Sequence, residues 1–171
     1  MKLEYAPAED TFALLDSLPN NVSTALEIGC GSCFILAHLD AKYKVGCDIR
    51  KPAIVSSGIN FVLCDGRKLP FRQNSFQLAF FNPPYLPSKG IQDPAVDGGR
   101  GGVEIALLFL TQSLDVTKDG GQIFTLLSSF SDLSLFRKTL IELRLNFSEK
   151  RKRLFFEELD VFKIYARKNS G

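Results

Sequence analysis

The chain has 171 residues, of which 45% are hydrophobic and 23% charged, a balance that excludes a disordered or fibrous protein. Its length predicts one domain over residues 1–171, burying about 70% of the surface of the unfolded chain. The net charge of +2 is too small for a protein that wraps nucleic acid. No apolar run reaches the roughly 20 residues of a membrane span and the first residues lack a signal peptide's apolar stretch, so we expect a cytoplasmic protein.

The first half of the chain alternates short apolar runs, typical of buried strands, with segments of helical spacing. Helices are expected at 8–18 and 34–39. Strands are expected at 25–28, 44–49, 60–64 and 76–81. This alternation predicts a parallel sheet with helices on both faces.

The second half of the chain continues this alternation of strands and helices and ends in two successive extended stretches. A helix over 103–116 leads into an apolar strand at 122–127, and an amphipathic helix follows over 131–145, with Ser131 as its cap. Extended stretches at 147–156 and 160–167 are joined by an acidic turn at 157–160, too short for a crossover helix. The fold class predicted is α/β: a mostly parallel seven-stranded sheet with one antiparallel strand from a C-terminal hairpin.

A glycine turn follows the first strand, in the segment Glu27-Ile28-Gly29-Cys30-Gly31-Ser32-Cys33. Glycines in this position let the backbone approach a ligand, although a tight structural turn would explain Gly29 and Gly31 equally well. Asp48 ends the second strand, where a carboxylate can accept both hydroxyls of a ribose. The dinucleotide pattern G-x-G-x-x-G fails, because Phe34 stands at its third glycine position.

The residues after the next two strands favour a ligand-binding site at these strand ends. Asp65 and Gly66 follow the third strand, and Asn82-Pro83-Pro84-Tyr85 follows the fourth. All of these ends lie on the rim where parallel sheets bind ligands. Their order resembles that of class I S-adenosylmethionine-dependent methyltransferases, and Asn-Pro-Pro-Tyr resembles the motif of those that methylate amide or exocyclic amino nitrogens. A surface turn is the alternative explanation of the four residues.

Three segments together resemble the HemK-like release-factor glutamine methyltransferases, in their short eukaryotic and archaeal branch. The segments are Tyr5–Phe12, Asn82–Leu86 and Gly98–Glu104. Cys33 departs from the family, which usually has a glycine there, and the connection between the second and third strands is unusually short. The resemblance implies a Rossmann-like class I fold and methyl transfer from S-adenosylmethionine to the glutamine amide of a Gly-Gly-Gln motif in a class I translation release factor.

The resemblance and the chemistry together assign roles to the strand-end residues. Asp48 would bind the ribose and Asp65 the adenine amino group; the predicted cofactor-binding set is Thr11, Glu27, Gly29, Gly31, Asp48, Asp65, Gly66 and Asn82. The predicted catalytic residues are Asn82, Pro83 and Tyr85. The Asn82 side-chain oxygen and the Pro83 carbonyl would accept the two hydrogens of the target amide, and the Tyr85 ring would face its plane.

Two other functions fit parts of this pattern. An adenine N6-methyltransferase acting on DNA or RNA would use Asn-Pro-Pro-Tyr in the same way, but 171 residues leave no room for a nucleic-acid recognition domain. A non-catalytic subunit that only binds the cofactor is disfavoured, because the proposed catalytic residues are all present.

A partner is predicted from the short connection at 50–59, which cannot hold a crossover helix. The third strand should therefore be an uncovered edge, exposing Ile59, Phe61, Val62 and Leu63. The resemblance implies a small zinc-binding methyltransferase activator protein as the partner, and homodimerisation through this edge is the alternative.

Two further features have alternative explanations. Cys30, Cys33, Cys47 and Cys64 are interpreted as small buried thiols, against a zinc site or a disulfide. The basic run Lys150-Arg151-Lys152-Arg153 is interpreted as a solvated edge, against a docking surface for an anionic partner.

Overall fold

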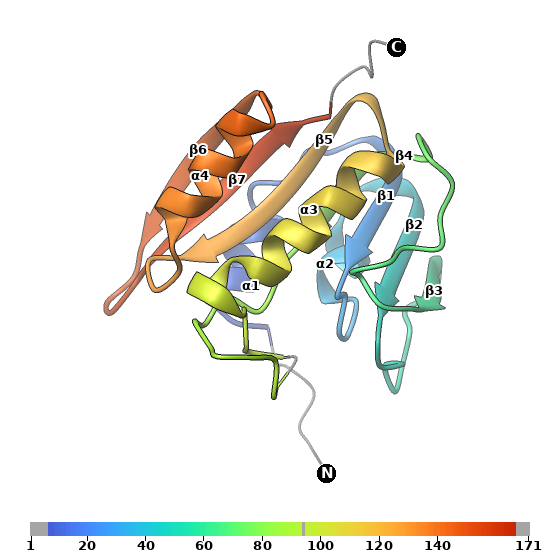
Figure 1. Cartoon of the computed structure of the whole chain (residues 1–171). Coiled ribbons are helices and arrows are strands. Elements are labelled where there is room, and N and C mark those ends of the chain that lie inside the picture. The colour runs from blue at the N-terminus through green and yellow to red at the C-terminus, as the bar shows by residue number, and fades with distance from the viewer. Residues whose placement is uncertain (1–6, 94, 167–171) are drawn as a thin grey trace.

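The computed structural model describes residues 7–93 and 95–166 of the chain. Their centre is a seven-stranded sheet in the order β3-β2-β1-β4-β5-β7-β6 (Figure 1). Tyr5, Ala6 and Arg167, which belong to the predicted motifs and strands, lie outside the described residues. No helix in the described part of the chain is both long and apolar enough to cross a bilayer.

The strands are parallel except for one. Their bounds are β1 Val22–Ile28, β2 Ala41–Asp48, β3 Ile59–Leu63, β4 Phe76–Phe81, β5 Thr117–Ser128, β6 Phe147–Arg153 and β7 Glu158–Tyr165. Only β7 is antiparallel to its neighbours β5 and β6, and the remaining pairs are parallel. The predicted mixed sheet with one antiparallel strand is therefore confirmed.

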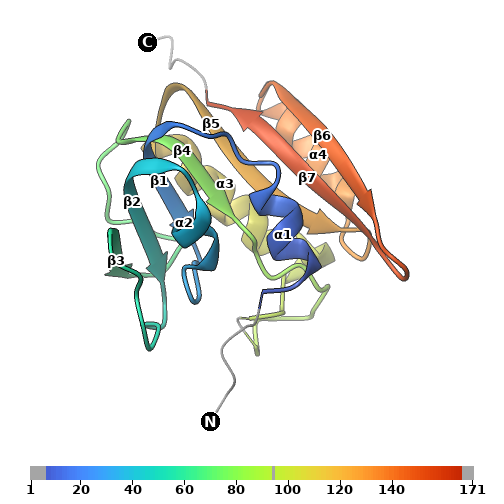
Figure 2. The same cartoon turned by 180° about the vertical axis from the view of Figure 1, so that it is seen from behind.

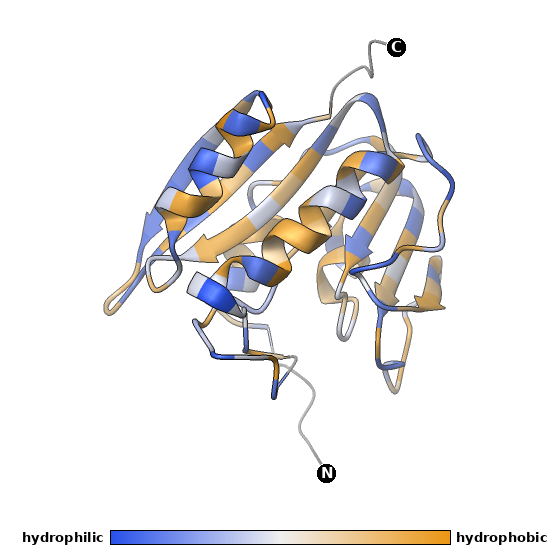
Figure 3. Cartoon of the chain, viewed as in Figure 1, coloured by the Kyte–Doolittle hydropathy of each residue, from blue (hydrophilic) through white to orange (hydrophobic). Residues whose placement is uncertain are grey.

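Helices cover both faces of the sheet, as Figures 1 and 2 show from opposite sides. Their bounds are α1 Glu9–Leu15, α2 Phe34–His38, the short 3₁₀ helix η1 Arg100–Gly102, α3 Glu104–Val116 and α4 Leu133–Glu142. One core lies under α3 and α4 and includes Phe136, and a second lies under α1 and α2 and includes Leu14. Hydrophobic residues concentrate in the middle of the sheet, and the edge strand β6 is hydrophilic (Figure 3).

Two local predictions were wrong. The hairpin turn lies at 154–157, where the Leu154 amide donates to the Glu157 carbonyl at 2.8 Å, and not at 157–160. Asp160 is instead a buried member of β7 that accepts from Arg151 at 2.8 Å, so its acidity does not mark a turn. Helix α4 is capped by Asp132, whose side chain accepts from the Leu135 amide, because the Ser131 hydroxyl donates to the Tyr85 carbonyl instead.

The edge of the sheet beyond β2 agrees with the prediction. β3 is the outermost strand, and residues 50–58 lead into it without a helix. Leu63 is 64% exposed and Ile54 in the connection is 81% exposed. Ile59, Phe61 and Val62 are half-buried, because each packs partly on the cores behind the sheet. Fewer apolar side chains of β3 are therefore exposed at this edge than the sequence predicted.

Candidate active site

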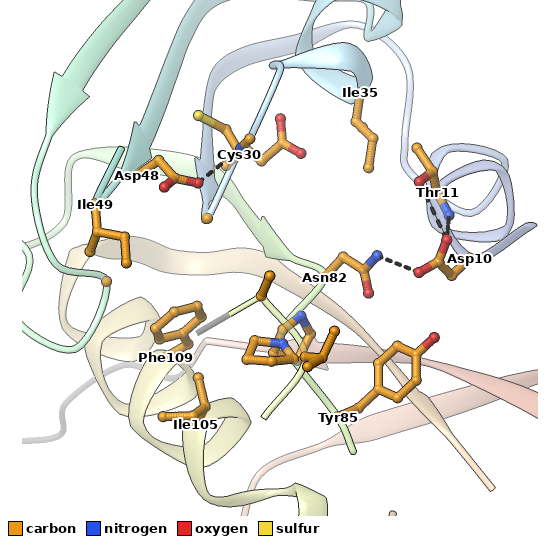
Figure 4. A pocket seen from close by; sticks show the side chains of 18 of the residues that line it. Asp10, Thr11, Cys30, Ile35, Asp48, Ile49, Asn82, Tyr85, Ile105 and Phe109 are labelled. Carbon is orange, nitrogen blue, oxygen red and sulfur yellow. Dashed lines mark hydrogen bonds between the residues drawn. The ribbon is translucent and has the colours of Figure 1, made fainter. Parts of the chain in front are cut away.

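The loops that follow β1, β2, β3 and β4 surround a cavity of about 410 Å³ at the carboxyl-end edge of the sheet. The predicted site residues all line this cavity: Thr11, Glu27, Gly29, Gly31, Asp48, Asp65, Gly66, Asn82, Pro83 and Tyr85. They meet there because parallel strands end at the same edge, and because the first turn of α1, with Asp10 and Thr11, reaches the cavity at that edge (Figure 4). The cavity is within the size range of small-molecule sites.

The glycine turn after β1 adopts a backbone that other residues rarely take. Gly29 has a φ of 71° and Gly31 a φ of 49°, both in the left-handed region that glycine enters without steric cost. The Gly31 amide donates to Asp48 Oδ2 at 3.0 Å, which ties the turn to the end of β2. Cys33, where the family usually has glycine, also has a positive φ of 59° and is fully buried.

Two carboxylates line the cavity at the ends of β2 and β3. Asp48 is half-buried, and its Oδ1 accepts from the Arg50 amide at 2.9 Å. Asp65 is paired with the Arg67 side chain at 2.6 Å. The hydrogen bonds from Arg67 lower the pKa of Asp65. This pair is solvent-exposed, and such pairs contribute at most about 1 kcal/mol, so a ligand group can compete for the Asp65 carboxylate at small cost.

Gly66 forms a cradle between the sheet and α3. A Cβ at this position would lie 2.5 Å from Ile28 Cγ2 and 2.7 Å from Phe109 Cε1, closer than real side chains approach. The missing side chain lets the Phe109 ring pack against the loop and face the cavity (Figure 4). Any larger residue would have to displace Ile28 or the cavity-lining Phe109.

Glu27 carries an unsatisfied carboxylate oxygen into this site. The residue is 4% exposed, and its Oε2 has no hydrogen-bond partner among the described residues. Burial is the main reason that its pKa lies well above the ordinary value of 4.5. A buried acid of this kind is complementary to a cationic ligand, which would supply the missing partner and favour the ionised form.

Asn82 is held by a residue far away in the sequence. Its Nδ2 donates to Asp10 Oδ2 at 2.9 Å. A carboxylate can only accept, so the amide nitrogen faces Asp10 and the oxygen faces the other way. Asn82 lines the cavity, and its Oδ1 is buried and has no hydrogen-bond partner within the described part of the chain (Figure 4). An oriented acceptor is thus available for an N–H donor.

Asp10 is the functional residue that sequence reasoning missed. It is 5% exposed and lines the cavity, and it also accepts from the Thr11 amide at 2.7 Å. The sequence pattern explained it as an acid in the first turn of a helix. The signal that could have found it is its place beside Thr11 in the segment that resembles the methyltransferase family. Ile105 and Phe109 were also missed, since an apolar residue on a core helix carries no signal for a site.

The turn at 82–85 is fixed by its neighbours. Ser131 Oγ donates to the Tyr85 carbonyl at 2.8 Å, and a Cβ on Gly98 would lie 2.7 Å from the Pro84 carbonyl oxygen. Pro83 is buried and Tyr85 half-buried. Burial, with the charges of Asp10 and Glu157, raises the pKa of Tyr85 to about 12. The phenol therefore stays neutral at physiological pH and presents an uncharged ring to the cavity.

Cys30 lines the cavity, whereas Cys33, Cys47, Cys64 and the basic run do not. All four cysteines are free thiols, with the sulfurs of Cys30 and Cys33 3.3 Å apart, and no metal-binding cluster occurs among residues 7–93 and 95–166. In the basic run, Arg151 and Arg153 pair with Glu158, and Lys152 pairs with Glu9. Most of its charge is therefore neutralised within the chain, which supports the interpretation as a solvated edge.

The chain is similar to known methyltransferases. A family model described as "Methyltransferase domain" matches residues 26–83. A Methanocaldococcus jannaschii protein assigned as a protein N5-glutamine methyltransferase is 31% identical, over 74% of this chain and 73% of its own. The eRF1 methyltransferase catalytic subunit mtq2 of Schizosaccharomyces pombe is 29% identical, over 68% of this chain and 69% of its own.

A solved structure extends the likeness to the complete fold. It is the E. cuniculi Mtq2–Trm112 complex responsible for methylation of the eRF1 translation termination factor. This chain superposes on it with a TM-score of 0.72 and 23% identity, and the match covers 95% of this chain and 98% of that one.

Proposed function

The chain belongs to the class I S-adenosylmethionine-dependent methyltransferases related to the protein N5-glutamine methyltransferases, and from that premise we propose the substrate. We propose that it methylates the side-chain amide nitrogen of the glutamine in the Gly-Gly-Gln motif of a class I translation release factor. The observation that carries the proposal is the buried, unpartnered Oδ1 of Asn82, which Asp10 orients.

The proposed role of Asn82 follows from the chemistry of amides. A planar amide nitrogen is a poor nucleophile, so the site must hold it in line with the methyl group and stabilise the positive charge that develops on it. Asn82 Oδ1 accepts one amide hydrogen and the Pro83 carbonyl accepts the other, while the neutral Tyr85 ring faces the amide plane. Asn82 and Pro83 would hold this nitrogen in line with the methyl group that S-adenosylmethionine would supply when bound, and the amide proton would then pass to solvent.

The cofactor residues fit the parts of S-adenosylmethionine, which supplies an electrophilic methyl group on a sulfonium. Glu27 offers its unpaired carboxylate to the cationic methionine part, and the Gly29–Gly31 backbone passes beside it. Asp48 would accept the ribose hydroxyls, and the adenine amino group would compete with Arg67 for the Asp65 carboxylate. Thr11 and Gly66 complete the walls, with Gly66 leaving room for the base beside Phe109.

Adenine N6-methylation is the second candidate, because an exocyclic amino nitrogen would also donate to Asn82 Oδ1. The relatives' names support the protein substrate.

The test is a methyl-transfer assay with labelled S-adenosylmethionine and three substrates in parallel. They are a purified release factor, the same factor with the motif glutamine replaced by alanine, and single- and double-stranded nucleic acid. Label on the first alone supports the proposal. Label on adenine, with none on the protein, would assign the enzyme to the second class.

We further propose that a small activator of the Trm112 kind covers the β3 edge. The fold neighbour is a complex with Trm112, and the relative from S. pombe is named a catalytic subunit. On this chain the outer side of β3 has no neighbouring strand in the described sheet, and Leu63 and Ile54 are exposed beside it. A strand added there would satisfy the open backbone groups and bury these side chains.

A further inference from the structure

Two phenylalanines stand on the turn between β6 and β7 with almost their whole surface in solvent. Phe155 is 92% exposed and Phe156 is 86% exposed, more than any other large hydrophobic residue described. Their rings contact each other edge to face, with centroids 4.8 Å apart. The turn is hydrophobic and follows the hydrophilic edge strand β6 (Figure 3). Exposed aromatic side chains of this kind commonly mark a surface that another molecule covers.

The turn lies near the active-site cavity, although Phe155 and Phe156 are not among the residues that line it. It projects from the same edge of the sheet as the loops that surround the cavity (Figure 1), and Glu157, the residue after Phe156, lines the cavity. Phe130, which follows β5, lines the cavity as well and is exposed. We call Phe130, Phe155 and Phe156 the aromatic lip.

Hydrogen bonds hold the parts of the aromatic lip together. Ser128 Oγ donates to Glu157 Oε2 at 2.6 Å, and the Ser129 amide donates to the Glu158 carbonyl at 2.8 Å. These bonds join the end of β5, which carries Phe130, to the start of β7, which carries the turn. The lip is therefore positioned before any partner arrives, which lowers the entropic cost of binding.

Apolar side chains also occur on the loop after the 82–85 turn. Leu86, Ile91 and Val96 line the cavity and are exposed. The entrance is thus apolar on the β5 side and on the loop side. Charges of both signs lie near it, namely the cavity-lining carboxylates Asp10 and Glu157 and the exposed Arg153 two residues before Phe155. The apolar part of this surface suits an apolar protein surface.

We propose that the aromatic lip docks the folded protein that carries the target glutamine, by contacting apolar side chains that flank its exposed loop. The proposal rests on the proposed function and adds the surface that selects the substrate. A single amide offers the enzyme few contacts, so affinity for a protein substrate must come from groups remote from the reacting nitrogen. Aromatic side chains are the residues that most often supply such affinity at protein interfaces.

The test compares a large and a small substrate. The double variant Phe155→Ala/Phe156→Ala is assayed on the release factor and on a short peptide containing Gly-Gly-Gln, with Ile141→Ala, an exposed apolar residue on α4, as matched control. We expect the KM for the protein to rise at least about tenfold with kcat within about twofold. The KM for the peptide, the affinity for S-adenosylmethionine by calorimetry and all values of the control should stay unchanged.

The outcomes separate the two proposals. A wild-type chain that methylates neither protein nor peptide overturns the proposed function and the lip's role with it. A wild-type chain that methylates both, with a double variant that keeps the parental KM for the protein, overturns the lip alone. An equal rise of the KM for the peptide also overturns the role of the lip. Two further results overturn it when the KM of the double variant for the protein is unchanged. One is a loss of self-association in light scattering, and the other is a loss of sedimentation with anionic vesicles.

Discussion

The contact between Asp10 and Asn82 is the arrangement on which the proposed chemistry depends. A lone asparagine in a cavity can turn its amide either way, and only one way presents an acceptor to the substrate. The buried Asp10 carboxylate removes that ambiguity, because it accepts from the Asn82 nitrogen at 2.9 Å. The second Asp10 oxygen accepts from Thr11 and holds the carboxylate in place. Asp10 is thus a positioning residue for Asn82.

Replacing Asn82 by alanine should stop methyl transfer while sparing the cofactor. The variant loses the group that orients the nucleophile and stabilises its developing charge, so single-turnover methylation should slow by about 100-fold or more. The dissociation constant for S-adenosylmethionine, measured by calorimetry, should change little.

Asp10 supplies the matched comparison for that variant. Asp10→Ala should also slow methylation, because the Asn82 amide is no longer oriented, whereas Asp10→Asn can still offer an oxygen to Asn82 Nδ2 and should recover part of the rate. Parental single-turnover rates in both Asn82→Ala and Asp10→Ala would contradict the amide clamp.

Glu27 should make the cofactor-free protein less stable as pH rises. Its folded pKa lies above 4.5, so the folded chain holds a proton that the unfolded chain has already lost, and the stability falls as pH increases from 4.5 toward the folded pKa. Glu27→Gln cannot titrate. Its melting temperature should therefore exceed that of the parent at pH 8, with a smaller difference at pH 5.

Thermal unfolding without cofactor at the two pH values makes this measurement. Glu142→Gln, which removes an exposed carboxylate of α4, is the control and should give the same small difference at both. A Glu27→Gln difference that does not depend on pH would show that burial does not protonate Glu27.

At the scale of elements, the site depends on how closely the loops approach the helices behind them. Gly66 brings the loop after β3 against Phe109 of α3, and Gly98 lies on the backbone of the 82–85 turn. The hairpin turn is likewise joined to the end of β5 through Ser128 and Ser129. The walls of the cavity are therefore loops held by packing and not by their own regular structure.

Gly66→Ala should destabilise the chain by about 1–3 kcal/mol, because its Cβ would overlap Ile28 and Phe109 in a packed core. Urea unfolding measures the change. Gly90→Ala is the matched control, since a Cβ there meets nothing within 4 Å. Equal stabilities of the two variants would contradict the tight packing at Gly66, and Phe109→Leu in the Gly66→Ala background should recover part of the loss.

At the scale of the whole molecule, the sheet has two unlike halves. The β5-β7-β6 side carries the hairpin with the aromatic lip, and the β1-β2-β3 side ends in a short strand reached without a crossover helix. The class I methyltransferase fold thus has its proposed substrate-docking surface on one side of the site and its proposed activator surface on the other. The two surfaces can be altered independently.

Leu63→Asp should weaken the complex with a Trm112-type activator at least about tenfold. The charge would be buried without a partner when a strand is added at β3. Co-purification and light scattering measure the complex, which should be 1:1 for the parent. Leu143→Asp, an exposed apolar residue after α4, is the control and should bind normally. Unchanged binding by Leu63→Asp, or a fully active monomer without activator, would refute the assignment of this edge.

The strand-end residues of the site could be predicted from the sequence alone. Gly29, Asp48, Asp65 and Asn82 follow four separate apolar runs, and the ends of parallel strands meet at one edge whatever the details of packing. The presence of one antiparallel strand in the C-terminal hairpin and the edge position of β3 followed from connection lengths, whereas the order of the other strands came from the structure. These properties depend on local periodicity and connection length, which can be read from the sequence.

Only the tertiary structure decided the contacts between distant segments. Asp10 and Asn82 are 72 residues apart, and their hydrogen bond depends on how α1 crosses the sheet edge. The hairpin register depends on burial. The buried Asp160 pairs with Arg151 across β6 and β7. The turn therefore falls at Phe155 and Phe156, near the active site. A local pattern cannot specify such pairings, because each is selected by the packing free energy of the whole fold.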